Sequence, residues 1–322
     1  MVSKTDVIMA YRLPMRCEPE SQGVIDGHAA HFRDLASLRA GFIGSGEFRQ
    51  TIKMPVANTS APGVKSLEWP AQPVQVDVPP EQLQRMIQRI EAEFAYLGEH
   101  EPHWSVLTAD RFKAANIAQH EAEFFASGET AIKHLRVTAE RTGIDLSRYK
   151  SCFELGCGLG RITIWLAKLF EQVTGGDISG TRLAQARQTV ERAGLKNVSF
   201  AHLNQFANYA NLPAFDVFFS FIVLQHNPPP LMAHILELIL TRLAPGGIAY
   251  FQIPTYQLGY RFSATEYLES KPPVADVEVH CVPQPDLFAI LARTGCDVLE
   301  MREDDALGAP TISNRLFVRK RR

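Results

Sequence analysis

The 322-residue sequence lacks the patterns that mark several specialised classes of protein. No apolar run approaches the roughly 20 residues that a membrane-spanning helix needs. The first residues contain no apolar core of a secretory signal peptide, and no internal repeat recurs at the period of a solenoid protein. We therefore expect a cytoplasmic chain without a membrane span.

Cysteine and charge give little indication of a special site. The five cysteines are scattered without a C-x-x-C pair, which favours reduced thiols and argues against a zinc site. No cluster of histidines and acids has the spacing of metal ligands, so we expect no metal. The formal net charge of −2 gives no global sign of an anionic partner, and from it we expect that no nucleic acid binds.

The chain does contain enough apolar residues, 46%, for a full core, and its length suggests about two domains. Periodic apolar residues predict a small helical module over 1–50. Six prolines predict a linker over 51–80, whose alternating valines favour one edge strand. An apolar stripe begins a helical segment over 81–145, which we expect to cap a cleft in a core domain over 146–322.

Strands and helices alternate from about residue 150, which predicts a parallel, doubly wound α/β sheet. The strands are expected at 152–155, 172–177, 198–202, 215–221, 248–253, 297–301 and 315–319. The intervening helices are expected at 161–170, 180–193, 230–243 and 285–294.

The most informative stretch is F-E-L-G-C-G-L-G-R over 153–161, where a strand runs into three alternating glycines and a helix. Glycines let the backbone turn tightly and approach a bulky ligand where a Cβ would collide. The dinucleotide fingerprint has the spacing G-x-G-x-x-G, whereas this stretch is G-x-G-x-G with Glu154 in front.

That stretch resembles motif I of the class I S-adenosylmethionine (AdoMet) methyltransferases. The resemblance continues in G-G-D-I-S over 175–179, in the strand motif over 215–226 and in the L-x-P-G-G turn over 243–247. It implies a Rossmann-like, doubly wound, seven-stranded and mostly parallel sheet with an antiparallel C-terminal strand, here preceded by an N-terminal helical extension. It also implies S-adenosyl-L-methionine as the cofactor.

The resemblance assigns cofactor contacts to particular residues. Glu154 is expected to order the glycine loop and the cofactor's ammonium, and Ile178 to pack on the adenine. Asp177 could accept both ribose hydroxyls, because a carboxylate has two acceptor oxygens; its alternative is a helix N-cap, a role that Ser179 could fill instead. Asn204 is the expected acceptor for the adenine amine. The remaining expected contacts are Gly156, Cys157, Gly158, Gly160, Arg161, Gln205, Phe221 and Gln225.

Two histidines are candidates for the chemistry. Methyl transfer from a sulfonium is an in-line displacement, and a hydroxyl acceptor usually needs a base. His226 follows the fourth strand, where the methyl group should point, although simple packing is an equal alternative. His280 lies in an insert over 254–283 that we expect to wall the acceptor pocket. Asn227 precedes three prolines but lacks the aromatic residue of the N-methyltransferase [N/D]-P-P motif, so we expect it to cap a helix with Pro228 at N1.

The expected function is methyl transfer to a hydroxyl, or less favourably an amine, of a small molecule or glycan. The glycan preference comes from residues 11–49, which resemble short helical modules in front of bacterial glycan-modifying enzymes. Residues 104–108 and 123–128 are expected lid contacts, and a homodimer is left open. The alternatives are an NAD-dependent oxidoreductase and a non-catalytic AdoMet-binding module.

Overall fold

The computed structural model describes residues 2–10, 21–35, 37–38, 69–271, 277–308 and 310–322, and the chain divides into two units after Trp69. In the first unit, α1 (Lys4–Ala10) contacts α2 (Gln22–His31). Val7 and Ile25 are buried, and Lys4 forms a 2.8 Å ion pair with Asp26. Residues 11–20 and 39–68, on which part of the expected helical module and most of the expected linker fall, lie outside the described residues.

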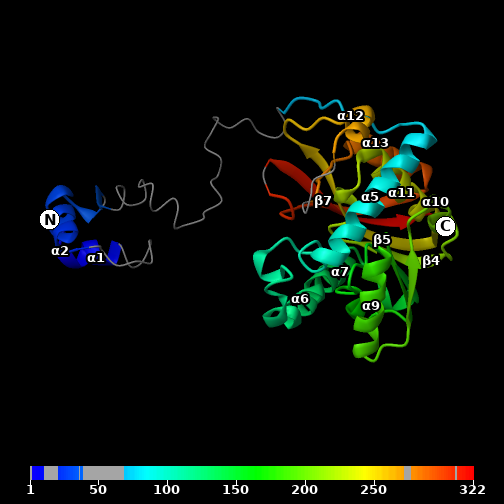
Figure 1. The fold of residues 1–322 in the computed structure, drawn as a ribbon, viewed down its shortest axis with the longest axis horizontal. Coiled ribbons are helices and arrows are strands. Elements are labelled where there is room, and N and C mark those ends of the chain that lie inside the picture. Colours follow the sequence, from blue (N-terminus) through cyan, green and yellow to red (C-terminus); the bar gives the residue numbers. More distant parts are fainter. Residues whose placement is uncertain (1, 11–20, 36, 39–68, 272–276, 309) are drawn as a thin grey trace. The chain divides into compact units, whose positions relative to one another are not determined.

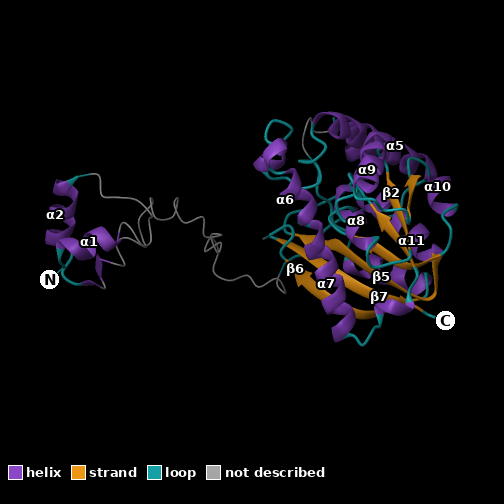
Figure 2. Cartoon of the chain, turned by 90° about the horizontal axis from the view of Figure 1, so that it is seen from below, coloured by secondary structure: helices purple, strands orange, loops and turns teal. Residues whose placement is uncertain are grey.

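The second unit, residues 70–322, contains a seven-stranded sheet in the order β3-β2-β1-β4-β5-β7-β6 (Figure 2). Strands β1 to β5 pair in parallel, while β7 is antiparallel to both β5 and β6. The strands are β1 (Ser151–Leu155), β2 (Gln172–Asp177), β3 (Val198–His202), β4 (Phe215–Ser220), β5 (Leu243–Gln257), β6 (Cys296–Asp304) and β7 (Thr311–Lys320). The predicted fold class is confirmed.

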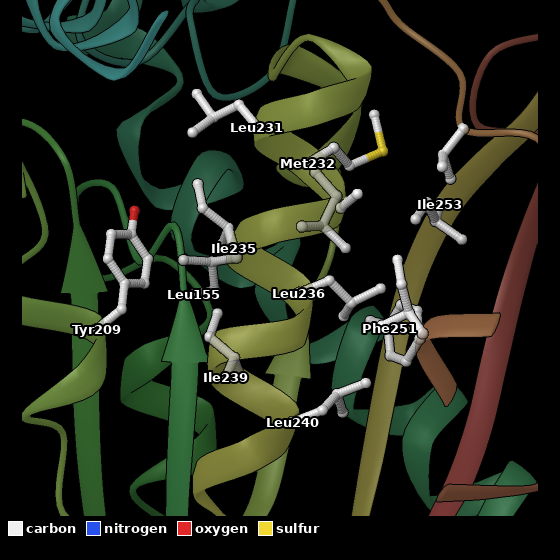
Figure 3. Close-up of a cluster of buried hydrophobic side chains, with 14 of the residues drawn as sticks. Leu155, Tyr209, Leu231, Met232, Ile235, Leu236, Ile239, Leu240, Phe251 and Ile253 are labelled. Carbon is white, nitrogen blue, oxygen red and sulfur yellow. The ribbon is translucent and has the colours of Figure 1, made fainter. Parts of the chain in front are cut away.

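Successive residues of the central strands point to opposite faces of the sheet, and each face packs on its own helices. Phe153 and Phe218 belong to the core shared with α11 (Pro229–Arg242) and α13 (Gln284–Arg293). Figure 3 shows this core around α11, whose leucine and isoleucine side chains lie between β1 and β5. Cys152 and Val217 instead contact the cluster under α7 (Gly128–Arg141).

The first helix after the glycine loop is much shorter than the predicted 161–170, because α8 spans only Thr163–Leu166. A run of β-branched residues at its start weakens helix propensity. The side chain of Asn197 then donates to the carbonyls of Ala167 and Phe170, at 2.8 and 3.0 Å. Those carbonyls therefore need no further helical turn to satisfy them.

Strand β5 is longer than the predicted 248–253 and includes the L-x-P-G-G turn. Leu243 pairs with Phe215 and the next pair joins Ile248 to Val217, so the turn forms a bulge within the strand. At the other end, pairing with β7 carries β5 to Gln257. Helices α9 (Gly180–Arg192), α10 (Phe206–Ala210) and α12 (Ala264–Glu269) belong to the same unit.

Helix α5 (Pro80–His100) crosses the unit in contact with α9, α11 and α12 (Figure 1). It is amphipathic, and Met86, Ile87 and Ile90 are buried on its inner stripe. Between α5 and α7 lie the short helices η3 (Asp110–Phe112), η4 (Ile117–Gln119) and α6 (Glu121–Ala126). Before α5, the expected edge strand is reduced to one isolated bridge between Val74 and Phe262.

The start of α7 packs so closely on the glycine loop that Gly128 tolerates no side chain. A Cβ there would lie 2.2 Å from the backbone oxygen of Arg161, which cannot rotate away. We expect Gly128→Ala to lower the free energy of unfolding by about 1–3 kcal/mol, the range for overpacking. Urea denaturation of the second unit measures it. Gly180→Ala at the start of α9, where a Cβ would make only an ordinary contact with His202 at 3.7 Å, is the control within the same unit. Equal stability of both variants would contradict the prediction.

Candidate functional site

The glycine loop lies where the strand order reverses, between β1 and β4, which is the usual ligand crevice of an open α/β sheet. The backbone N–H groups of Gly156 and Cys157 both donate to the carbonyl of Gly176, at 2.7 and 3.0 Å. The loop is thereby fixed to the end of β2. Its three glycines all have positive φ, a conformation that favours glycine.

Gly156 and Gly158 bring bare backbone against neighbouring segments. A Cβ on Gly156 would lie 2.4 Å from a methyl group of Val223, and one on Gly158 would lie 3.2 Å from Val106. The loop backbone therefore meets both the segment after β4 and the helical segment before α6 without a side chain of its own. A ligand lying between these segments would contact the loop's main chain directly.

Asp177 anchors the other wall of the pocket. Its carboxylate is 4% exposed and accepts the N–H of Gly158 at 2.8 Å and that of Ser179 at 2.9 Å. Ser179, not Asp177, caps α9, because its hydroxyl accepts the N–H of Arg182. Each carboxylate oxygen keeps an unused lone pair in a pocket that Asp177 lines, which suits a ligand with paired hydroxyls.

Glu154 is buried at the end of β1 and lines the same pocket. Burial raises the pKa of its carboxyl to about 7, partly opposed by the hydroxyl of Thr163, which donates to it at 2.6 Å. Near neutral pH the carboxyl is therefore close to half ionised. A cationic group placed beside it would favour the ionised form.

Arg161 brings a buried guanidinium to the glycine loop. It donates to the hydroxyl of Ser127 at 3.1 Å, but its Nε has no hydrogen-bond partner. Burial lowers its pKa to about 10, so the group stays charged at neutral pH. A buried donor without a partner costs roughly 1–3 kcal/mol, and an anionic ligand group would satisfy it.

His226 closes the pocket from the 3₁₀ turn η6 (Leu224–His226). Its Nδ1 lies 2.9 Å from the carbonyl oxygen of Glu278, which can only accept, so Nδ1 carries the proton. The lone pair on Nε2 accepts from the side-chain amide of Gln225 at 3.4 Å. Burial lowers the pKa of the ring to about 4. Nearby, Ile222 lines the pocket with φ +57°, an unfavourable conformation for a β-branched residue.

His280 does not line this pocket, so its role as a second catalytic residue stays a prediction. It is buried behind His226, where its Nδ1 lies 2.9 Å from the hydroxyl of Tyr260 and its Nε2 lies 3.4 Å from a carboxylate oxygen of Glu278. Because both ring nitrogens are engaged, His280 supports the segment whose carbonyl holds His226. Arg89 on α5 contacts the other oxygen of Glu278 at 3.3 Å.

The structure brings most of the expected site residues together. Those that line the pocket are Glu154, Gly156, Cys157, Gly158, Arg161, Asp177, Ile178, Phe221 and His226. Gly160, Ser179, Asn204, Gln205 and Gln225 do not line it. The amide of Asn204 donates to Glu91 at 2.8 Å, and the carbonyl oxygen of the Gln225 side chain accepts from Gln252 at 3.0 Å. Their roles toward a cofactor stay predictions.

Some residues that line the pocket could be identified only from the structure. Ser105 and Val106 fall in the segment expected as a lid, but Ile90 and Phe94 of α5 were expected only as an apolar stripe. Arg182, Tyr209, Ile222 and Val223 were not expected at all. The available signal for Arg182 was a cation in the first turn of the helix that follows Asp177.

Asn227 does not cap α11, contrary to the expectation. The N-cap is Pro228 and the helix begins at Pro229. The amide of Asn227 instead donates to the carbonyl of Val223 at 3.1 Å, which braces the turn that carries His226.

Within the ranges that the structure describes, no helix is both long and apolar enough to cross a membrane. Nor do the described residues contain a group of three or more histidines, cysteines or acids that could hold a metal ion.

Comparison with known proteins shows that the glycine loop and the strands around it are similar to a known domain family. Residues 153–247 match a family model described as a methyltransferase domain. The 23S rRNA (uracil(747)-C(5))-methyltransferase of Yersinia pseudotuberculosis is 35% identical over 95 residues, which are 30% of this chain and 25% of that protein. The chain thus spans about a quarter of the length of this curated relative.

A solved structure shows the same fold. Magnesium protoporphyrin IX methyltransferase from Synechocystis PCC 6803, with bound SAH, superposes with a TM-score of 0.51 at 18% identity. The match covers 74% of this chain and 99% of that one. It therefore extends beyond the matched domain to most of the second unit.

The comparisons correct the expectation about partners, which excluded nucleic acid. That expectation is wrong, because curated relatives of this chain are by name methyltransferases of 23S rRNA. The physical error lies in using the net charge of the whole chain. A local site can bind an anion whatever the sum of the remaining surface charges.

The raised pKa of the Glu154 carboxyl predicts that the stability of the protein depends on pH. A carboxyl whose folded pKa is raised from 4.5 to about 7 contributes its full stability below pH 4.5 and loses it as the pH rises through 7. Glu154→Gln removes that loss. At pH 8.5 we therefore expect the free energy of unfolding of the variant to exceed that of the wild type by about 3 kcal/mol. At pH 4.5 the two should be nearly equal.

Urea denaturation at both pH values measures this difference. Glu191→Gln, at an exposed position of α9, is the control and should change little at either pH. Equal stabilities of Glu154→Gln and the wild type at pH 8.5 would show that the carboxyl is not buried in its charged form.

Proposed function

We propose that this chain, whose residues 153–247 match a methyltransferase domain, is a class I AdoMet-dependent methyltransferase and that it methylates a hydroxyl oxygen held beside His226. An amine is the less favoured acceptor. The observation that carries the proposal is the convergence of the glycine loop, two buried carboxylates and an unprotonated imidazole nitrogen on one pocket.

The pocket residues fit the cofactor group by group. Asp177 would accept the ribose hydroxyls with its free lone pairs, and Glu154 would accept the ammonium, which favours its ionised form. The unpartnered Nε of Arg161 would donate to the carboxylate. The methionine chain would lie along the side-chain-free backbone of Gly156 and Gly158, between Val223 and Val106. When bound, AdoMet supplies an already activated methyl group, so these residues would mainly hold and orient the cofactor.

The chemical role left to the protein is removal of the acceptor's proton. His226 has a low pKa, about 4, but its Nε2 is unprotonated at neutral pH. A hydroxyl becomes far more acidic once its oxygen bonds to the methyl carbon. A weak base placed within hydrogen-bond reach can therefore take the proton late in the transfer.

The thiol in the pocket argues for an oxygen acceptor rather than a uracil carbon. Methylation at C5 requires that carbon to become nucleophilic, which a thiolate added to the neighbouring ring carbon would achieve. Cys157 lines the pocket, but burial holds the pKa of its thiol well above the usual range. It is therefore an unreactive thiol at neutral pH.

Two segments complete the proposed site. The helical segment over 81–145 acts as the cap, supported by Ile90, Phe94, Ser105 and Val106 in the pocket wall. The described part of the insert over 254–283, which omits residues 272–276, forms the acceptor side, supported by the carbonyl of Glu278 on His226. Together they would exclude water during transfer. We place the reaction in the cytoplasm, in keeping with four cysteines that are free and buried in the described residues.

The function is tested by supplying methyl-tritiated AdoMet with three fractions of a bacterial lysate: small molecules, glycans and total RNA including ribosomal RNA. We expect label in one fraction, and mass spectrometry of its hydrolysate should find an O-methyl group. Label at C5 of uracil, or cofactor binding without any labelled acceptor, would refute the proposal.

Asp177→Asn should weaken binding of S-adenosylhomocysteine at least tenfold, because a charged acceptor of the ribose hydroxyls is lost. Isothermal titration calorimetry measures the affinity. The matched control is Asp216→Asn, since Asp216 also accepts backbone N–H groups at a strand end, from Lys150 and Ser151, but outside the pocket. Equal affinities in the two variants would refute the ribose assignment.

His226→Ala should lower the turnover rate by roughly 10²–10⁴-fold, the usual contribution of a positioned base, with cofactor affinity nearly unchanged. At saturating cofactor the wild-type rate should stay level between pH 6 and 8. It should fall only as the pH drops toward about 4, because protonation of the ring removes the lone pair. Full turnover in the variant would show that His226 is not the base.

A further inference from the structure

Arg182 is a buried cation in the proposed site that the cofactor contacts leave unused. It lies in the first turn of α9, is 4% exposed and lines the pocket together with Asp177 and His226. Its guanidinium donates to the hydroxyl of Ser105 and stacks 4.8 Å from the centre of the Phe94 ring. Its Nε has no hydrogen-bond partner.

No carboxylate among the described residues forms an ion pair with Arg182. Asp177 is the nearby acid, but its two oxygens already accept the N–H groups of Gly158 and Ser179. Keeping a guanidinium out of water without a paired anion is expensive, and an apolar side chain of similar size would often be more stable there. The charge is thus suited to an anion that enters the pocket.

Charge balance indicates which molecule carries that anion. The pocket contains two acids, Glu154 and Asp177, and two guanidinium groups, Arg161 and Arg182, while His226 is neutral. AdoMet contributes an ammonium, a carboxylate and a sulfonium, so its binding leaves one positive charge in excess. An acceptor with one negative charge would bring the closed site to neutrality.

The position of Arg182 separates it from the methionine end of the pocket. Arg161 adjoins the glycine loop and Glu154, where the carboxylate of the cofactor is expected. Arg182 instead contacts Phe94 and Ser105, which belong to the cap, and its charge acts on His226. The unpartnered Nε–H group of Arg182 is therefore available to the molecule that accepts the methyl group.

We propose that Arg182 binds an oxyanion of the acceptor, a phosphate or a carboxylate, and thereby holds the reacting hydroxyl near His226. Ser105 positions the guanidinium, because its hydroxyl accepts from Arg182 and donates to the carbonyl of Pro102 at 3.1 Å. This inference rests on the proposed function and adds the chemical class of the acceptor. Arginine suits the task because its planar fork can donate two parallel hydrogen bonds to such a group. Arg182 is a specificity-determining residue, not part of the proton transfer.

The test measures binding of inorganic phosphate and of acetate to the full chain saturated with S-adenosylhomocysteine, by thermal shift and calorimetry. We expect at least one anion to stabilise the wild-type complex. Arg182→Met should weaken that binding at least tenfold and Ser105→Ala should weaken it several-fold, while Arg182→Lys retains part of it. Arg187→Met is the matched control, because Arg187 is exposed on the same helix and should leave anion binding unchanged. Preference for phosphate or for acetate tells which oxyanion the site takes.

The affinity of the wild type and the Arg182→Met variant for S-adenosylhomocysteine distinguishes a failure of this inference from a failure of the proposed function. Arg182→Met should keep its affinity for S-adenosylhomocysteine within about threefold. A tenfold loss of that affinity would make Arg182 a cofactor residue and overturn the inference. Anion binding unaffected by Arg182→Met, or absent from a wild-type complex that binds the cofactor, would overturn the inference alone. A wild type that fails to bind S-adenosylhomocysteine would refute the proposed function itself. Should Arg182→Met not fold, Ser105→Ala and Arg182→Lys decide the question.

Discussion

The rest of the pocket depends on the anchoring of Asp177 at the end of β2. Its carboxylate holds the glycine loop through Gly158 and the start of α9 through Ser179. One buried charge thus fixes the two backbone segments that would enclose the cofactor, with two charge-assisted hydrogen bonds. The carbonyl of the preceding Gly176 adds two more bonds to the loop. The protein's own hydrogen bonds thus hold this wall in place, and Asp177 lines the pocket beside it.

Burial in the site disfavours the charged forms of Glu154 and His226. Burial raises the pKa of Glu154 to about 7 and lowers that of His226 to about 4, so both groups are shifted toward their neutral forms. A cofactor with its own ammonium would restore the ionised Glu154, while the neutral His226 is the form that can accept a proton. The same low-polarity surroundings that destabilise isolated charges would strengthen each hydrogen bond to a bound ligand.

Features set by short sequence spacing could be predicted, and features set by long-range contacts could not. The glycine spacing and Asp177 sit at strand ends, so alternation of strands and helices was enough to place them in one crevice. The early end of α8 depends on Asn197, about thirty residues away, and the pocket position of Arg182 depends on Ser105 and Phe94 from the cap. His280 looked equivalent to His226 in sequence, and what distinguishes them is that only His226 lines the pocket.

The network behind His226 links the cap to the orientation of the base. Arg89 on α5 binds the carboxylate of Glu278, and the backbone carbonyl of the same residue fixes the protonated nitrogen of His226. His280 braces that carboxylate from the other side. A displacement of α5 would therefore disturb the hydrogen bond that selects the imidazole tautomer, as well as moving Phe94 relative to Arg182. Under the proposed function, a seated cap would both exclude water and align the proton acceptor, so methyl transfer would require the cap as well as an occupied cofactor site.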